Sequence, residues 1–279
     1  MEIIIGKLSG FCNGVKNTID KAEEALINNS NVYCLGQIVH NERVIKDLED
    51  KGLTIVNSLD EIKDDSKVII RAHGERKEIY DEIDKRGLDL IDLTCGKVKA
   101  IRIKVSREKD NHFIVIIGKK EHPETLGIKS FAPNNSIIIE NEEDIDELLD
   151  KDFDSLYIVS QTTFNEDKFD MLVNMIKERV DKDIIVDKTI CDATSKRQEE
   201  TRELSKDVDM MIIVGGKNSS NTKELEVIAK ENCDNTYLIQ DYNDLVEIDF
   251  NNIEKIGIMA GASTSYVVVD EIVNYLNNM

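Results

Sequence analysis

Three of the five cysteines stand in the same kind of sequence context. Cys12, Cys95 and Cys191 each follow a short apolar segment and precede a stretch with helical spacing, as in LDLIDLTCGKVKAIRIKVSREK. In that stretch Val98, Ile101, Ile103 and Val105 are the expected apolar face of the helix. A cysteine at a strand-to-helix junction lies where backbone N–H groups converge, which suits a thiolate ligand. Any one of them could be a small buried residue, but three matched positions, 83 and 96 residues apart, favour a shared metal centre.

Six other apolar segments lead into loops with side chains that suit binding or proton transfer. In open α/β sheets, ligands bind at the carboxyl ends of the strands, so these loops could converge on one cavity. The serine-rich loops could instead be helix N-caps, or they could cradle an anion with hydroxyls and backbone amides. The side chains concerned are His40, His73, His122, Glu124, Thr162, Ser219, Ser220, Asn221 and Ser263.

The donor set narrows the choice of metal. Structural zinc normally takes four ligands, often in closely spaced cysteine pairs, whereas these three cysteines are remote in sequence. Cys34 and Cys233 lack the matching context and are expected to be packed core and a bystander. A 4Fe–4S cluster held by three thiolates leaves one iron open to substrate. An open iron beside an anion cradle and a carboxylic acid indicates redox or Lewis-acid chemistry on a small phosphorylated substrate.

Apolar strands alternate with charged amphipathic helices along the chain, which is typical of mostly parallel sheets. The recurring cysteine predicts three successive α/β units. We expect their boundaries at 13–95, 96–188, and 189–279 with the N-terminal strand 1–12 added to the third unit. With two prolines and no Gly/Ser-rich linker, the units should pack directly against one another.

Composition excludes several classes of partner. A net charge of −20 opposes binding to nucleic acid and to anionic membranes. The longest apolar runs, such as Met210–Val214, are far shorter than the ~20 residues that a membrane-spanning helix needs. Residues 1–7 do not read as a signal peptide, and five widely spaced cysteines do not form a disulfide framework. We therefore expect a cytoplasmic protein.

The motifs together resemble the 4-hydroxy-3-methylbut-2-enyl diphosphate reductase family of the non-mevalonate isoprenoid pathway, over essentially the whole chain. The resemblance implies a cloverleaf of three α/β units around a central 4Fe–4S cluster. It also implies a two-electron reductive dehydroxylation at the open iron, giving isopentenyl diphosphate and dimethylallyl diphosphate. The motifs, in chain order, are GFCNGVKNTIDKAEEAL, VHNERVIKDLEDKG, RAHGE, DLTCGKV, EHPETLG, SQTTF, TICDATSKRQEE, VGGKNSSNTKEL and AGAST.

The resemblance also implies roles for individual residues. Cys12, Cys95 and Cys191 match the cluster ligands, and Glu124 matches the proton source, with Thr162 beside it and His122 as a further catalytic residue. Bound diphosphate would raise the pKa of Glu124 toward neutrality. One departure is Gly96, where the family usually has proline, which puts the rigidity of the Cys95 turn in doubt. The residues that match the substrate pocket are His40, His73, His122, Ser219, Ser220, Asn221 and Ser263.

Two other functions and one partner surface stay open at this stage. A hydro-lyase would use the open iron without consuming electrons, and an iron–sulphur sensor would leave the polar loops unused. The implied electron donor is a ferredoxin or flavodoxin. A basic collar near the cysteines could dock such an acidic donor, although these side chains could equally be solvated helix faces. The collar would consist of Lys16, Lys97, Lys99, Lys196 and Arg197.

Overall fold

The computed structural model describes residues 1–27 and 29–279. They form two compact units. Unit 1 contains residues 1–17, 39–47 and 192–279, and unit 2 contains residues 18–38 and 48–191. Helices α1 (Asn13–Ile27) and α2 (Glu42–Asp50) have residues in both.

All strand pairs are parallel, and the strands form three four-stranded sheets with the orders β1-β12-β10-β11, β3-β2-β4-β5 and β7-β6-β8-β9. The first sheet belongs to unit 1 and the other two to unit 2. This confirms the predicted fold class, an α/β protein with three sheet-and-helix units. The predicted boundaries of those units remain a prediction.

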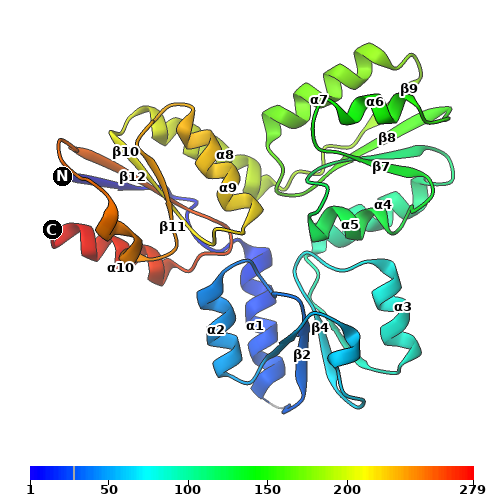
Figure 1. The fold of residues 1–279 in the computed structure, drawn as a ribbon, viewed down its shortest axis with the longest axis horizontal. Coiled ribbons are helices and arrows are strands. Elements are labelled where there is room, and N and C mark those ends of the chain that lie inside the picture. Colours follow the sequence, from blue (N-terminus) through cyan, green and yellow to red (C-terminus); the bar gives the residue numbers. More distant parts are fainter. Residues whose placement is uncertain (28) are drawn as a thin grey trace. The chain divides into compact units, whose positions relative to one another are not determined.

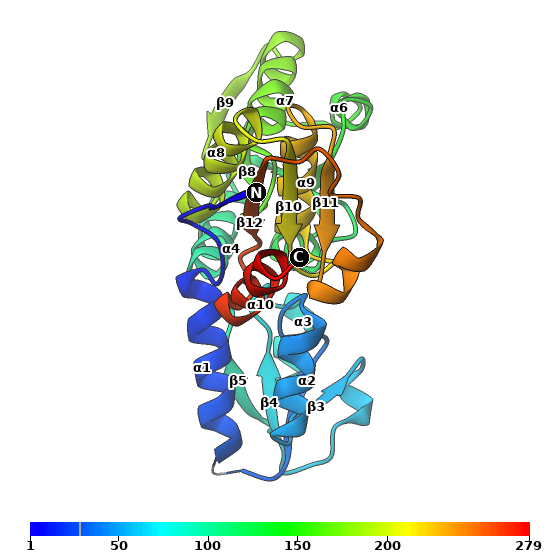
Figure 2. The ribbon, with the colours of Figure 1, turned by 90° about the vertical axis from the view of Figure 1, so that its left-hand side faces the viewer.

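Unit 1 is one sheet with helices on both faces. Helix α9 and residue Leu204 of α8 pack on one face, and α10 with the 3-10 helix η2 packs on the other. Strands β10 and β11 run side by side in the same direction (Figure 2). The elements are β1 (Glu2–Ile5), α8 (Asp192–Lys206), β10 (Met210–Val214), α9 (Ser220–Lys230), β11 (Thr236–Ile239), η2 (Tyr242–Glu247), β12 (Lys255–Ala260) and α10 (Tyr266–Asn277).

The first sheet of unit 2 precedes Cys95. Helix α3 and the 3-10 helix η1 pack on it through Ile79, Ile83 and Leu59. A capping box at Ser58 and Glu61 fixes the start of η1. The elements are β2 (Val32–Leu35), β3 (Thr54–Val56), η1 (Leu59–Glu61), β4 (Lys67–Ile70), α3 (Lys77–Lys85) and β5 (Asp89–Asp92).

The second sheet of unit 2 precedes Cys191. Helices α4 and α5 cover one face and α6 and α7 cover the other (Figure 1). Strand β6, FIVII, is buried along its whole length, as parallel strands covered on both faces are. The elements are α4 (Gly96–Glu108), β6 (Phe113–Ile117), α5 (Pro123–Lys129), β7 (Ser136–Ile139), α6 (Asp144–Leu149), β8 (Ser155–Ser160), α7 (Glu166–Arg179) and β9 (Asp183–Val186).

Helix α4 departs from the expected pattern at two neighbouring positions. Val98, Ile101 and Val105 are buried as predicted, but Ile103 is 52% exposed, so its place in the apolar face is wrong. Arg102 is buried instead, at 5% exposure. Positions 98, 101, 102 and 105 follow the three- and four-residue spacing of one helix face, whereas position 103 falls outside it.

No helix in the described part of the chain has both the length and the apolar character needed to cross a membrane.

Candidate functional site

Each of the three cysteine turns is built in the same way. The cysteine follows an edge strand, and its backbone N–H donates to a carbonyl in the loop after the neighbouring strand. All three cysteines are partly exposed, whereas Cys34 and Cys233 are buried. The three bonds run from Cys12 N to Ala262 O at 3.1 Å, from Cys95 N to Ala72 O at 2.9 Å, and from Cys191 N to Thr162 O at 3.0 Å.

The Cys95 turn is held by the residues before it. Asp92 Oδ1 accepts from the backbone N–H of Thr94 at 3.0 Å and from its hydroxyl at 2.5 Å. Because that hydroxyl donates to Asp92, the 3.0 Å contact between Tyr80 Oη and Thr94 Oγ1 has Tyr80 as the donor. Gly96 is the first residue of α4, and a Cβ there would meet nothing within 4 Å. This network supports the backbone turn that presents Cys95.

The loop before Cys12 is held by α8. The Arg197 side chain is buried, and its Nε and Nη2 donate to Leu8 O and Gly10 O, both at 2.9 Å. The Glu200 carboxylate accepts from the backbone N–H groups of Lys7 at 2.6 Å and Leu8 at 2.8 Å. The prediction that Arg197 belongs to an exposed basic collar is therefore wrong, because its guanidinium is committed to backbone carbonyls.

Unit 2 contains a buried carboxyl group. Glu124 lies on α5 and is 1% exposed. Its Oε1 accepts from the backbone N–H of Thr162 at 2.6 Å, and its Oε2 accepts from the Thr162 hydroxyl at 2.8 Å. Burial raises the pKa of Glu124 to about 7, while the two bonds from Thr162 and the charge of Arg102 oppose that rise. The predicted rise in the pKa of Glu124 is therefore correct in direction. Burial causes it, and no bound diphosphate is needed.

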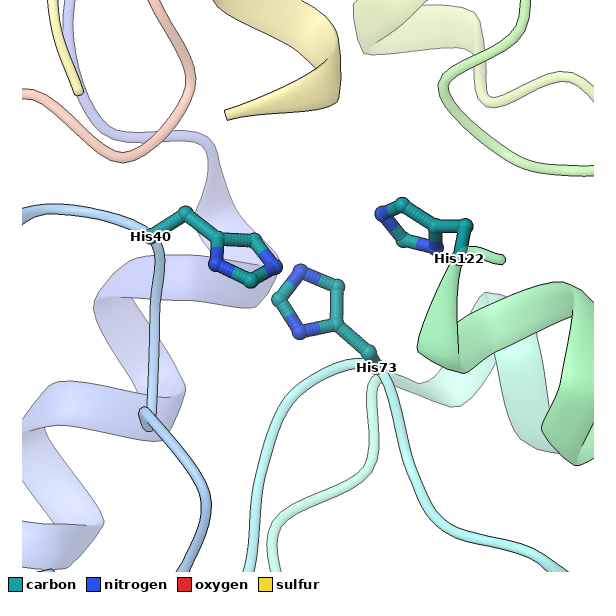
Figure 3. A group of neighbouring side chains, drawn as sticks. All are labelled: His40, His73 and His122. Carbon is teal, nitrogen blue, oxygen red and sulfur yellow. The ribbon is translucent and has the colours of Figure 1, made fainter. Parts of the chain in front are cut away.

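Two of the predicted histidines meet in unit 2. The rings of His73, in the loop after β4, and His122, before α5, lie edge to face with centroids 5.3 Å apart (Figure 3). His122 Nδ1 accepts from the backbone N–H of Glu124 at 3.1 Å and caps α5. A neutral His122 ring therefore carries its proton on Nε2, which can donate to an acceptor.

Unit 1 contains the serine-rich loop and its helix. Ser219 caps α9, its hydroxyl accepting from Thr222 N at 3.3 Å, so the helix-cap interpretation holds for this residue. Ser220 and Asn221 follow in the first turn and are buried. Neither amide atom of Asn221 has a hydrogen-bond partner among the described residues. Since buried polar groups are nearly always paired, this amide is suited to a ligand.

A second polar group in unit 1 joins the loop after β12 to the start of α2. Ser263 is 7% exposed, and its hydroxyl lies 3.5 Å from His40 O. Asn41 Nδ2 donates to Ser263 O at 2.9 Å. The cap of α10 is Ser265, not Ser263. These two contacts fix the backbone of Ser263 next to the backbone of His40 within this unit. The His40 ring is labelled in Figure 3.

The predicted residues divide between the two units, and each set is described within its own unit. Cys95, Cys191, His73, His122, Glu124 and Thr162 belong to unit 2, and Cys12, His40, Ser219, Ser220, Asn221 and Ser263 belong to unit 1. Tyr80 and Arg102 were not predicted as site residues, and Arg197 is buried and does not belong to an exposed basic collar. The one available signal was that Arg102 falls on the apolar face of its helix.

Comparisons with known proteins cover the whole chain. Residues 3–277 match the model of the family described as LytB protein. A 4-hydroxy-3-methylbut-2-enyl diphosphate reductase from Aquifex aeolicus is 40% identical, over 98% of this chain and 94% of the relative. The enzyme of that name from Alkaliphilus oremlandii is 38% identical over 100% of both chains. These matches confirm the predicted family and the predicted enzyme class, an oxidoreductase.

Solved structures agree with this assignment. The structure of the E-1-hydroxy-2-methyl-but-2-enyl-4-diphosphate reductase from Plasmodium falciparum superimposes with a TM-score of 0.93 and 32% identity, covering 99% of this chain and 88% of that one. A structure titled as (E)-4-hydroxy-3-methyl-but-2-enyl diphosphate reductase, the terminal enzyme of the non-mevalonate pathway, gives a TM-score of 0.72 and 38% identity, with 100% of both chains covered.

Proposed function

Because the chain belongs to the LytB family, we propose that it reduces 4-hydroxy-3-methylbut-2-enyl diphosphate to isopentenyl diphosphate and dimethylallyl diphosphate. The observation that carries this proposal is the buried Glu124, held by Thr162, in the same unit as two of the three matched cysteine turns. A carboxyl group whose pKa lies at about 7 is half protonated at neutral pH. It can therefore deliver a proton where an ordinary glutamate could not.

The proposed cofactor is one 4Fe–4S cluster held by Cys12, Cys95 and Cys191. The donor set fits such a cluster, because soft thiolates are its usual ligands and each of these cysteines is accessible and fixed by the same backbone bond. When bound, the cluster would relay the two electrons from an external donor and would present an open iron that acts as a Lewis acid.

The chain's own residues would hold and move the proton. Glu124 is fixed through both carboxyl oxygens, so its proton would be presented in a defined direction. Thr162 would relay the replacement proton, since its hydroxyl lies 2.8 Å from Glu124 Oε2 and can accept one proton, ultimately from solvent, as it donates its own. The buried surroundings exclude water from the carboxyl group, which keeps the proton for the departing hydroxyl group.

The diphosphate would be bound by histidine rings, hydroxyls and an amide, which are directional hydrogen-bond donors. In unit 1 these would be the Asn221 amide, the hydroxyls of Ser219, Ser220 and Ser263, and the His40 ring. In unit 2, His122 Nε2–H and the His73 ring would complete the set. Directional bonds to phosphate oxygens orient the substrate.

We further propose that a ferredoxin or flavodoxin supplies the electrons and that the protein works in the cytoplasm. The chain's net charge of −20 means that an acidic donor would need a local basic surface. With Arg197 buried, that surface would depend on the lysines of the proposed collar.

The proposal is tested by anaerobic purification, iron and sulphide analysis, and turnover of the diphosphate with a chemical reductant. We expect iron and sulphide in equal amounts and two electrons consumed per product. Turnover without electrons would indicate a hydro-lyase. A loaded cluster without turnover would indicate a sensor, and a colourless protein containing zinc would remove the cofactor assignment.

A further inference from the structure

Helix α4, which begins directly after Cys95, carries a buried arginine at its centre. Arg102 is 5% exposed. Its Nη2 donates to Glu75 O at 2.8 Å and lies 3.5 Å from His73 O, and its Nη1 donates to Tyr80 Oη at 2.7 Å. The guanidinium therefore grips the backbone on both sides of Gly74, in the loop that presents His73.

Two glycines make room for this side chain. A Cβ on Gly74, whose φ is +73°, would lie 2.0 Å from Arg102 Nη2. A Cβ on Gly127, in α5, would lie 2.7 Å from the same atom and 3.2 Å from Glu75 O. The guanidinium also lies over the ring of Phe131, 5.4 Å from its centroid. Arg102 thus fills a space bounded by the His73 loop and by the helix that carries Glu124.

The partners of Arg102 are all uncharged. Among residues 1–27 and 29–279, its hydrogen-bond acceptors are a tyrosine hydroxyl and backbone carbonyls, and its Nε has no hydrogen-bond partner. A buried cation whose hydrogen-bond partners are all uncharged is costly. A purely apolar residue would pack this helix face at lower cost, so the contacts that only a guanidinium can make are the feature that needs an explanation.

Arg102 also connects with the cysteine turn. Tyr80 Oη accepts from Arg102 and donates to Thr94 Oγ1, and Thr94 precedes Cys95. One hydrogen-bonded chain therefore runs from the His73 loop through Arg102 to the Cys95 turn. The charge of Arg102 also acts on the Glu124 carboxyl group, where it opposes the rise in pKa that burial causes.

We propose that Arg102 is a positioning residue for the reductase reaction: its guanidinium fixes the His73 loop against α5, so that His73, His122 and Glu124 keep one relative arrangement. This inference rests on the proposed function. It assigns Arg102 no contact with substrate or cluster. If it is correct, loss of the guanidinium changes the turnover and KM of each enzyme molecule that carries a cluster, and not only the number of molecules that bind one.

The test compares three variants of the holoenzyme with one control. Arg102→Met removes the positive charge and the hydrogen bonds. Arg102→Lys keeps the charge but lacks the planar guanidinium with its several N–H donors. Gly127→Ala keeps Arg102 but displaces its guanidinium, because the added Cβ would lie 2.7 Å from Nη2. Alanine has a higher helix propensity than glycine, so α5 itself should not be weakened. The control is Arg107→Met, an exposed arginine on the same helix. Turnover and KM are measured per loaded cluster, with a chemical reductant as electron source.

We expect kcat/KM per cluster to fall at least about tenfold in Arg102→Met and Gly127→Ala, since small misplacements of reacting groups have large effects. The lysine variant should lie between these and wild type. The control should stay within about twofold of wild type, as surface changes do. If the methionine variant fails to load its cluster, Gly127→Ala decides the outcome.

A second readout is independent of activity. The chain has only four histidines, so isotope-labelled histidine gives four sets of ring signals in the NMR spectrum of the oxidised holoenzyme. The signals of His73 and His122 should shift in the two disruptive variants, while His112 serves as the reference. Unchanged ring signals together with wild-type kinetics per cluster would overturn the proposal. An inactive wild-type protein would instead refute the proposed function, and the ring signals would still test the positioning.

Discussion

Replacing Glu124 by glutamine should abolish most turnover while leaving the fold intact. Glutamine has the same shape, and its amide can accept from Thr162 N and donate to the Thr162 hydroxyl. What it cannot do is release a proton. Loss of a general acid typically lowers the rate by roughly 10²- to 10⁴-fold. We therefore expect a loss of that size in kcat, with cluster content unchanged.

The structure also fixes the sign and size of a pH effect. Burial raises the pKa of Glu124 from its ordinary value of 4.5 to about 7. Between pH 4.5 and pH 7 the folded chain keeps a proton that the unfolded chain has released. The free energy of unfolding therefore decreases as the pH rises from 4.5 to 7. The full shift corresponds to about 3 kcal/mol. Relative to wild type, Glu124→Gln should gain that amount across the window.

Infrared difference spectroscopy measures this group directly. At about pH 6 nearly all ordinary carboxyl groups are ionised, so the spectrum of wild type minus Glu124→Gln should show one protonated carboxyl band that titrates near pH 7. Turnover should fall above the same pH, because the protonated form is the active one. A difference spectrum without that band at pH 6 would show that Glu124 is an ordinary carboxylate and not the proposed acid.

Three further predictions follow from individual contacts. Gly96→Pro should stabilise the protein by about 0.4–1 kcal/mol in denaturant unfolding, with unchanged iron content. A Cβ at this position meets nothing within 4 Å, and Cys95, at φ −54° and ψ 137°, already has the backbone conformation that precedes proline. A loss of stability would contradict this prediction. Arg197→Met should lose roughly 3 kcal/mol, from two charge-assisted bonds, and should release iron to a chelator faster; an unchanged release rate would show that the Cys12 loop does not need it. Asn221→Ala should raise KM for the diphosphate at least about tenfold without lowering the melting temperature. The reason is that the buried Asn221 amide has no hydrogen-bond partner among the described residues, so the folded protein loses no bond when it is removed. An unchanged KM would remove this residue from the substrate site.

The sequence contained enough information for the sheets and the cysteine turns, because those depend on local patterns. Continuous apolar runs such as Met210–Val214 are typical of buried parallel strands, and strands were expected there. Strands β3, β7 and β11 were not predicted, because no chemically suggestive loop follows them. Their length is not the reason, since β1, β5 and β9 are equally short edge strands.

The contacts that shape the site could not be predicted from local patterns. Cys12 is fixed by Ala262, and Arg197 by Leu8 and Gly10, which are partners far away in the chain. An arginine among charged neighbours reads as solvent-exposed until the fold closes around it, and both Arg102 and Arg197 prove to be buried. The raised pKa of Glu124 was expected from a bound diphosphate, whereas burial causes it.

A cysteine scan under anaerobic conditions shows whether three thiolates hold one cluster. Iron and sulphide per chain are measured in serine variants of Cys12, Cys95 and Cys191, with Cys34 and Cys233 variants as controls. We predict about four irons per chain in wild type and in both controls, and a severe loss in each of the other three. Full iron content in any one of those three variants would contradict the account.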